Sequence, residues 1–163
     1  MKAIDFKRRL NLPSNLEQLL GQWGESKVLH WLIDRGHESA QVNFRAIDVM
    51  THVCHHDLFF NVSIQVKTGT LQYDKRKAKT RKFFHFHTSK GSKSKQPYRA
   101  RDFDLFAFCG YEEDQIYFVP RWEVNQLTIN IREEVFKNEK LSNESFKLSL
   151  DKMYTRLIKS QVA

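Results

Sequence analysis

The stretch that decides the fold is residues 59–67, Phe-Phe-Asn-Val-Ser-Ile-Gln-Val-Lys. Its even-numbered residues from 60 to 66 are apolar, and its odd-numbered residues from 61 to 67 are polar. This period of two is typical of a β-strand that buries one face. We therefore expect a strand whose apolar face lies in the core and whose polar face is available for chemistry.

The preceding residues 46–54, Ala-Ile-Asp-Val-Met-Thr-His-Val-Cys, have a strand pattern too, and a short polar segment at 55–58 separates the two stretches. Two strands joined by so short a connection predict an antiparallel hairpin.

The hairpin brings polar groups together. If Cys54 pairs with Phe59, the same register places Asp48 opposite Gln65. Lys67 then lies one step along the same face. A divalent cation could bridge the carboxylate and the carboxamide oxygen. Each residue taken singly could also be an exposed strand position, but one register that satisfies three chemical roles favours a catalytic site.

Helical patterns precede the hairpin. Ser14 and Glu17 have the spacing of a capping box, and an apolar stripe follows them. A second helical stretch runs from Glu25 to Arg35 and stops at Gly36, which suits a helix C-terminus.

Glycines separate these two stretches. We expect Gly21 and Gly24 to allow a close approach of the helix backbone to the sheet, which would bring Glu25 toward Asp48. The alternative is that Glu25 is a favourable negative charge in the first turn of a helix.

The composition fits one domain. The chain has 163 residues, 40% of them apolar, with 13 Phe. We predict a single domain over 1–163, with a core at about 14–120 and a helical part at 121–163. The N-terminal segment lacks the apolar run of a secretory signal, so a cytoplasmic location is expected. Cys54 and Cys109 fall in apolar strand patterns and are predicted to be buried free thiols.

The net charge of +8 is concentrated in one segment. Residues 75–101 hold eleven Lys or Arg and no Asp or Glu, whereas the remainder holds 16 basic and 19 acidic residues. The alternative is a solvated loop, but the position of this segment directly after the 59–67 strand favours binding to nucleic acid. The predicted DNA contacts are Lys75, Arg76, Lys77, Lys79, Arg81, Lys82, His85, His87, Lys90, Lys93, Lys95, Tyr98, Arg99 and Arg101. The alternative for Tyr98 is that its ring stacks on the core.

A strand pattern divides the basic segment. Phe84 and Phe86 would lie on one side, and His85 and His87 on the other, within the alternating residues 82–89. Two basic loops would then flank this strand, and either could enter a DNA groove.

The histidines of the first hairpin invite a zinc interpretation. The cluster comprises His52, Cys54, His55 and His56. Neighbouring strand residues face opposite ways, however, and no second ligand pair has zinc-site spacing, so a zinc site is not predicted.

Two further acids lead into the apolar strand that begins at Leu105. We predict structural roles for Asp102 and Asp104, in pairs with Arg99 or Arg101.

The remaining patterns complete the fold. Residues 103–120 predict a second hairpin, and helical patterns follow at 133–139 and 146–160. This order of elements indicates an α/β fold with a mixed central β-sheet flanked by helices.

Taken in order, these motifs resemble the PD-(D/E)XK nuclease superfamily, and within it the small endonucleases associated with group I introns. Such proteins have a restriction-endonuclease-like core. The resemblance covers about Gly21 to Pro120. The elements that carry it are G-x-x-G-E at 21–25, the strand with Asp48, Gln65-Val66-Lys67-Thr68-Gly69, Phe86-His87-Thr88-Ser89, Tyr98, Asp102, and the strands at 104–108 and 116–120.

The resemblance implies metal-dependent hydrolysis of DNA phosphodiester bonds, with Glu25, Asp48, Gln65 and Lys67 in the catalytic positions. Glu25, Asp48, the Gln65 oxygen and the Val66 carbonyl would hold Mg²⁺, for which Mn²⁺ could substitute. Lys67 would position the nucleophile or stabilise the transition state. Gln65 departs from the acid usual in the superfamily, a substitution that the intron subgroup tolerates.

Three functions fit these features. The first is a site-specific, homing-type endonuclease acting on double-stranded DNA. The alternatives are a Holliday junction resolvase and a DNA-binding module without catalysis. Because cutting both strands commonly needs two active sites, a homodimer or homotetramer is expected, with the apolar side of the last helix as one possible contact.

Overall fold

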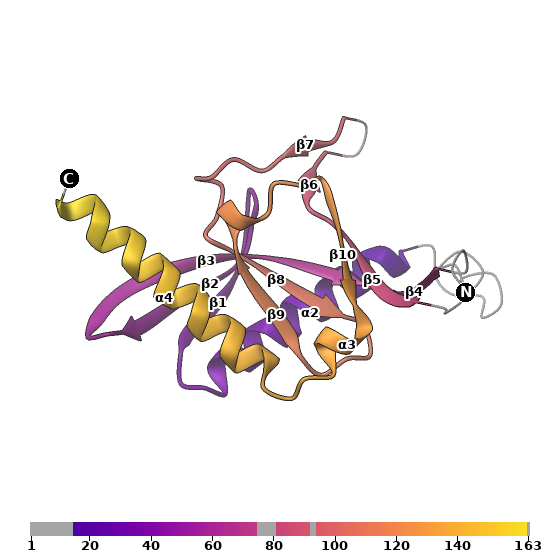
Figure 1. Ribbon diagram of the computed structural model, residues 1–163, viewed down its shortest axis with the longest axis horizontal. Helices are drawn as coiled ribbons and strands as arrows, with labels where there is room; N and C mark the ends of the chain where they lie inside the picture. The colour runs from indigo at the N-terminus through magenta and orange to yellow at the C-terminus, as the bar shows by residue number, and fades with distance from the viewer. Residues whose placement is uncertain (1–14, 75–80, 92–93, 163) are drawn as a thin grey trace.

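The computed structural model describes residues 15–74, 81–91 and 94–162 (Figure 1). Its helices and strands are α2 (Leu16–Ile33), β1 (Glu38–Phe44), β2 (Ile47–His55), β3 (Leu58–Gly69), β4 (Leu71–Asp74), β5 (Arg81–His87), β6 (Ser89–Lys90), β7 (Gln96–Pro97), β8 (Leu105–Gly110), β9 (Ile116–Pro120), the 3₁₀ turn η1 (Arg121–Glu123), β10 (Thr128–Arg132), α3 (Glu133–Phe136) and α4 (Leu141–Val162). The α/β class predicted from the sequence is confirmed.

The central sheet has the strand order β1-β2-β3-β8-β9. β3 pairs antiparallel with β2 and parallel with β8, so the sheet is mixed, as predicted. The predicted register of the first hairpin is also confirmed, since Cys54 pairs with Phe59 and Val49 with Ile64. β8 and β9 form the second predicted hairpin.

The two faces of the central sheet bury different partners. Leu105, Ala107 and Cys109 of β8 belong to a core cluster to which both α2 and α4 contribute. The alternate residues of the same strand, Phe106 and Phe108, belong to a second cluster with β5, β10 and α3. Every residue of β8 is buried, as expected for a strand covered on both faces.

A smaller sheet, ordered β10-β5-β4, contributes to the second cluster. Phe84 and Phe86 of β5 are each 1% exposed, whereas His85 and His87 lie on the other side of the strand and are more accessible. The alternation predicted for this strand is therefore confirmed.

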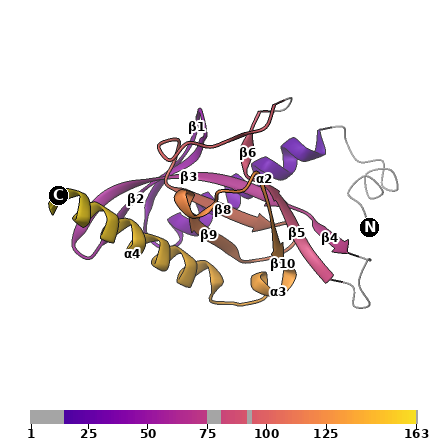
Figure 2. The ribbon, with the colours of Figure 1, turned by 45° about the horizontal axis from the view of Figure 1, so that its top comes forward.

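The molecule is elongated along the first hairpin. In Figures 1 and 2 the tip of the β2–β3 hairpin lies beside α4, at the end of the molecule opposite β4 and β5. No helix among the described residues is long and apolar enough to cross a membrane.

The two helical stretches predicted before the hairpin form one helix. α2 continues through Gly21 and Gly24 without a break. Its N-cap is Asn15, which makes no side-chain capping bond, and Ser14 of the predicted capping box lies outside the described residues. A glycine costs a helix about 1 kcal/mol, which the burial of Val28 and Leu32 on the same helix offsets.

The prediction for Cys54 was wrong. Cys54 is exposed, and Cys109 is buried as expected. Val53 is buried, so the alternation of β2 turns its neighbour Cys54 toward solvent.

Five of the strands in the described residues were not predicted, namely β1, β4, β6, β7 and β10. β1 has the sequence Glu-Ser-Ala-Gln-Val-Asn-Phe, in which Ala40, Val42 and Phe44 alternate with polar residues, and it occupies the edge of the central sheet. β10 is a five-residue segment whose partner, β5, is distant in the sequence. Ile129 and Ile131 alternate with polar residues, which is a local strand pattern, but such a pattern does not show that the partner is β5.

Gly24 is where α2 approaches β3. A Cβ at this position would lie 2.1 Å from the Thr68 hydroxyl oxygen, whereas a Cβ at Gly21 would meet nothing within 4 Å. The prediction that glycines permit the approach therefore holds for Gly24 and not for Gly21.

We predict opposite effects for alanine at these two glycines. Gly24→Ala should lower the free energy of unfolding by about 1–3 kcal/mol, because overpacking outweighs the gain of about 1 kcal/mol in helix propensity. Gly21→Ala should be neutral or stabilising. Urea denaturation measures both.

A double variant tests the cause of the Gly24 effect. The Thr68 hydroxyl is buried and has no hydrogen-bond partner among the residues that the structure describes, so Thr68→Ala removes the clashing atom without breaking a bond there. Gly24→Ala combined with Thr68→Ala should regain most of the stability lost. An equal loss with and without the threonine would contradict steric overlap as the cause.

Candidate active site

Asp48 lies where β2 separates from β3. The pairing of the two strands begins at Val49 and Ile64, so Asp48 is just beyond it. There the carboxylate replaces the strand as hydrogen-bond acceptor: its Oδ2 accepts from the main-chain amide of Val66 at 2.7 Å and from the side-chain amide of Gln65. The predicted juxtaposition of Asp48 and Gln65 is therefore observed.

Burial raises the pKa of Asp48 from its ordinary value of 3.8 to about 6. The bond from Val66 and the positive charge of Lys67 act in the opposite direction, and the negative charge of Glu25 acts in the same direction as burial. These effects place Glu25 and Lys67 within electrostatic range of Asp48. The carboxylate thus lies in a site where added positive charge would be favourable.

Gln65 is 6% exposed and points its amide nitrogen at Asp48. A half-turn of the amide would present its oxygen instead. That oxygen, the carboxylates of Glu25 and Asp48 and the Val66 carbonyl would make a set of metal ligands that are all oxygen atoms. Such ligands suit a hard divalent cation. The donor set therefore fits the magnesium site expected from the sequence.

Glu25 is held by a residue that the sequence did not single out. Its Oε2 accepts a hydrogen bond of 2.6 Å from the side-chain amide of Gln41 on β1. The alternation of Ala40, Val42 and Phe44 with polar residues could have indicated the strand, but no local pattern places Gln41 beside α2.

Lys67 is anchored by Tyr98. The lysine Nζ donates to the tyrosine hydroxyl at 3.0 Å. Tyr98 is only 7% exposed, and its ring packs edge-on against Phe103 and Phe106. Of the two roles predicted for Tyr98, stacking on the core is the one observed, and a ring enclosed by the core has no free face for a base. The phenol instead positions the lysine.

The other predicted DNA contacts are distributed around this site. Those outside the described residues are Lys75, Arg76, Lys77, Lys79 and Lys93. Exposed side chains are those of Arg81, Lys82, His87, Lys95, Arg99 and Arg101, and half-buried ones are those of His85 and Lys90.

Several of these cations have protein partners. Lys82 lies 3.7 Å from Glu133, and Lys90 lies 3.1 Å from Asp102. The Lys95 ammonium lies 3.2 Å from the His87 ring.

His87 lies on the same side as Lys67. Burial first, and then the charges of neighbours that include Lys95 and Lys67, lower the pKa of His87. The positive charge of Lys67 in the candidate site therefore acts on His87 of β5.

Asp102 and Asp104 have structural roles, as predicted, and Asp102 bonds to the predicted Arg99 through its main-chain amide, whereas Asp104 has a different partner. Asp102 accepts from the main-chain amide of Arg99 at 2.8 Å and from Lys90. Asp104 accepts from the main-chain amide and the hydroxyl of Ser63, at 2.8 and 2.6 Å. These bonds tie the start of β8 to β3.

Comparison with known proteins agrees with this geometry. The chain is similar in structure to "a bacterial homing endonuclease: I-Ssp6803I", with a TM-score of 0.55 and 16% sequence identity over 71% of this chain and 78% of that chain. At this identity the likeness concerns the fold, and it confirms the restriction-endonuclease-like class. No curated protein sequence matches the chain. The sequence profile described as PD-(D/E)XK endonuclease matches residues 18–149, which include the whole candidate site. The chain belongs to the PD-(D/E)XK endonuclease family.

Proposed function

We propose that this nuclease is a metal-dependent, site-specific endonuclease that hydrolyses phosphodiester bonds of double-stranded DNA. The observation that carries the proposal is the convergence of Asp48 and Gln65, with Glu25 and Lys67 in electrostatic range of the same carboxylate. Family membership alone would permit many nucleic-acid substrates. The residue types of this site support cation-assisted phosphodiester hydrolysis.

In this proposal Glu25, Asp48, Gln65 and the Val66 carbonyl hold Mg²⁺. When bound, the cation would lower the pKa of a coordinated water and offset charge on the scissile phosphate. Lys67, held by its bond to the Tyr98 hydroxyl, contributes a fixed positive charge beside that phosphate. A preorganised cation needs no rearrangement as charge develops in the transition state.

The surface beside Lys67 supports DNA as the substrate. His85 and His87 on β5 face the solvent side, and Lys95 lies against His87. Positive charge next to the catalytic lysine would bind the phosphates that flank the scissile bond. A resolvase would have a similar site, so the substrate itself must distinguish the two.

We further propose that the chain acts as a homodimer or homotetramer. α4 buries Leu150 and Met153 in the core, while Leu148, Leu157 and Ile158 remain 38–55% exposed. Exposed leucine and isoleucine side chains on one helix are suited to a contact between copies. Light scattering of the purified chain should give the mass of a dimer or tetramer. A monomeric mass both alone and on DNA would contradict the proposal.

The raised pKa of Asp48 predicts how stability depends on pH. In the metal-free chain, folding favours the protonated form of Asp48. The stability that this form contributes is therefore fully present below pH 3.8 and is lost as the pH rises through about 6. Across that interval wild type should lose stability relative to Asp48→Asn, which stays neutral. Urea unfolding in EDTA measures the difference.

Mg²⁺ provides the control for this experiment. At a pH above 6 it should stabilise wild type, whose ionised carboxylate can bind it, more than Asp48→Asn. If the stability difference between the two proteins stays constant across the interval, the pKa of Asp48 does not depend on folding as described.

The main test is cleavage of a randomised duplex library and of a labelled four-way junction in Mg²⁺. Wild type should cut a preferred duplex sequence and be inactive in EDTA. Lys67→Ala should reduce cleavage by about 100-fold or more while retaining DNA binding. Cutting confined to the junction would favour the resolvase, and binding of both substrates without cutting would favour a module without catalysis.

Tyr98→Phe is the matched variant. It keeps the buried ring and removes only the hydroxyl that accepts from Lys67. Cleavage should fall by about tenfold, less than for Lys67→Ala, because the charge remains but is no longer fixed. Its unfolding free energy should change little.

A further inference from the structure

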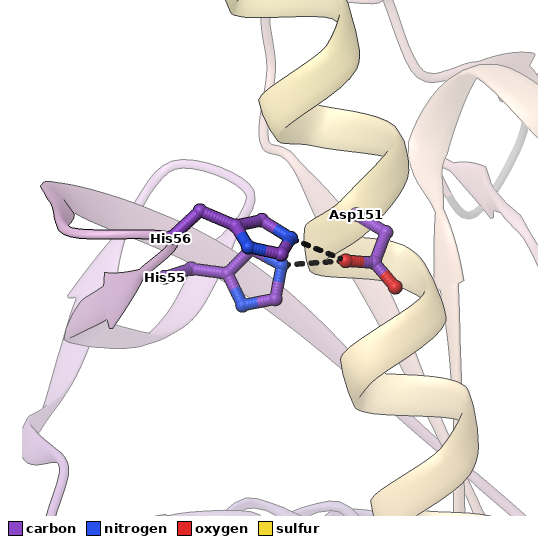
Figure 3. Close-up of side chains that lie close together, drawn as sticks. All are labelled: His55, His56 and Asp151. Carbon is purple, nitrogen blue, oxygen red and sulfur yellow. Dashed lines mark hydrogen bonds and ion pairs between the residues drawn. The ribbon is translucent and has the colours of Figure 1, made fainter.

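A second polar cluster lies at the tip of the β2–β3 hairpin, outside the candidate active site. The Nε2 atoms of His55 and His56 lie 2.7 and 3.1 Å from the same carboxylate oxygen, Oδ1 of Asp151 on α4. Figure 3 shows both rings turned toward that oxygen. All three atoms lie within 4.8 Å of one another. Two imidazoles and a carboxylate thus converge on one point.

The turn explains how two consecutive histidines can face the same way. His55 pairs with Leu58 at the end of the ladder, which leaves His56 and Asp57 as the two loop residues. Their φ angles are 49° and 60°, the left-handed conformation of a type I′ hairpin turn. Alternation between faces applies only within a strand, so the turn brings the His56 ring to 4.3 Å from that of His55.

We propose that His55, His56 and Asp151 form a Zn²⁺ site that links the hairpin tip to α4. Two imidazole nitrogens and one carboxylate oxygen are ligands that zinc accepts in a tetrahedral site, with water in the fourth position. The hairpin alone supplies only two of these three ligands. The third ligand comes from a helix 95 residues further along the chain, a contact that spacing cannot reveal.

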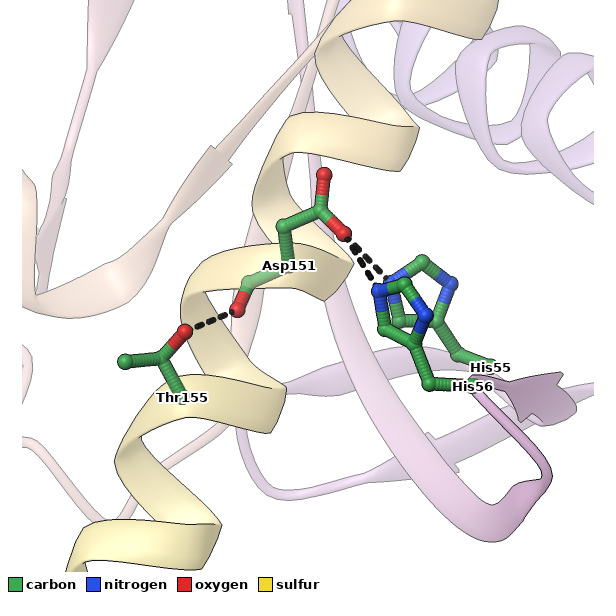
Figure 4. Close-up of polar contacts among 4 residues, drawn as sticks. All are labelled: His55, His56, Asp151 and Thr155. Carbon is green, nitrogen blue, oxygen red and sulfur yellow. Dashed lines mark hydrogen bonds and ion pairs between the residues drawn. The ribbon is translucent and has the colours of Figure 1, made fainter.

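The surroundings suit a site that solvent can reach. The His55 side chain is 12% exposed and is held on the protein side, while His56 and Asp151 are 55% and 40% exposed and open to solvent. The Tyr154 ring lies 4.9 Å from that of His56 and forms one wall. Thr155 donates to the main-chain oxygen of Asp151 at 2.8 Å, so it does not compete for the carboxylate (Figure 4).

This site is distinct from the proposed nuclease centre. His55 is seven residues along β2 from Asp48, a separation of about 23 Å in an extended strand. The two sites also differ in ligand chemistry, since the nuclease centre offers oxygen donors to a hard cation. Excess Mg²⁺ can therefore occupy one site while zinc is titrated into the other.

Calorimetric titration of zinc sulfate into the metal-stripped full chain, in excess Mg²⁺, tests the proposal. Wild type should bind one zinc ion. Asp151→Asn and His56→Ala should each weaken binding by more than about tenfold, since changes outside the ligand set already cost about 10–100-fold. Zinc should raise the melting temperature of wild type and not of these variants.

Two matched variants exclude neighbouring groups. His52 lies on the same hairpin but bonds to Asn61 at 2.8 Å, and Cys54 is an exposed thiol. His52→Ala and Cys54→Ser should bind zinc as wild type does. The proposal is overturned if zinc binding survives in both ligand variants, because the ion is then held elsewhere, or if wild type binds no more tightly than Asp151→Asn. Because the His56 side chain is more than half exposed, its removal leaves a folded protein for the comparison.

Discussion

The hydrogen bond from the Val66 main-chain amide to the Asp48 carboxylate is the interaction on which the site depends. It occurs where the β2–β3 ladder ends, so a side chain takes the place of the next strand residue as acceptor. The bond fixes the carboxylate beside Gln65 and one residue from Lys67. Burial opposes it by disfavouring the charged form, so the same position that builds the site raises the pKa of Asp48. Burial of the ionised Asp48 carboxylate in this geometry thus lowers the stability of the fold, as is common at functional sites.

Much of this arrangement could be predicted because it is encoded locally. Alternation in residues 59–67 predicts which face is polar, and the length of the connection sets the register that joins Asp48 to Gln65. The approach of α2 is less local, but a glycine immediately before Glu25 indicates it, and Gly24 proves to be the point of contact with Thr68. The alternation of period two therefore predicts the register of the hairpin, and a single glycine predicts where the helix approaches the sheet.

The parts that could not be predicted depend on pairing between distant segments. Gln41 holds Glu25 from the edge strand β1, whose own alternation of apolar and polar residues does not reveal that it lies beside α2. Tyr98 lies in a basic segment and is a residue type that can contact DNA, but its ring is buried against Phe103 and Phe106. Its hydroxyl accepts a hydrogen bond from Lys67. In each case the residue supports a predicted catalytic group rather than acting itself. Sequence patterns identify the reactive groups better than they identify the residues that orient them.

The two ends of the β2–β3 hairpin are chemically and electrically separate. The two ends are about 23 Å apart, a distance greater than the screening length of about 8 Å at physiological ionic strength. A cation held by His55, His56 and Asp151 would therefore have little effect on the pKa of Asp48, and would act by joining the hairpin tip to α4. α4 also packs on the central sheet through Phe146. The long hairpin can thus hold the Asp48 carboxylate at one end because its other end is bonded to α4 by a separate set of residues.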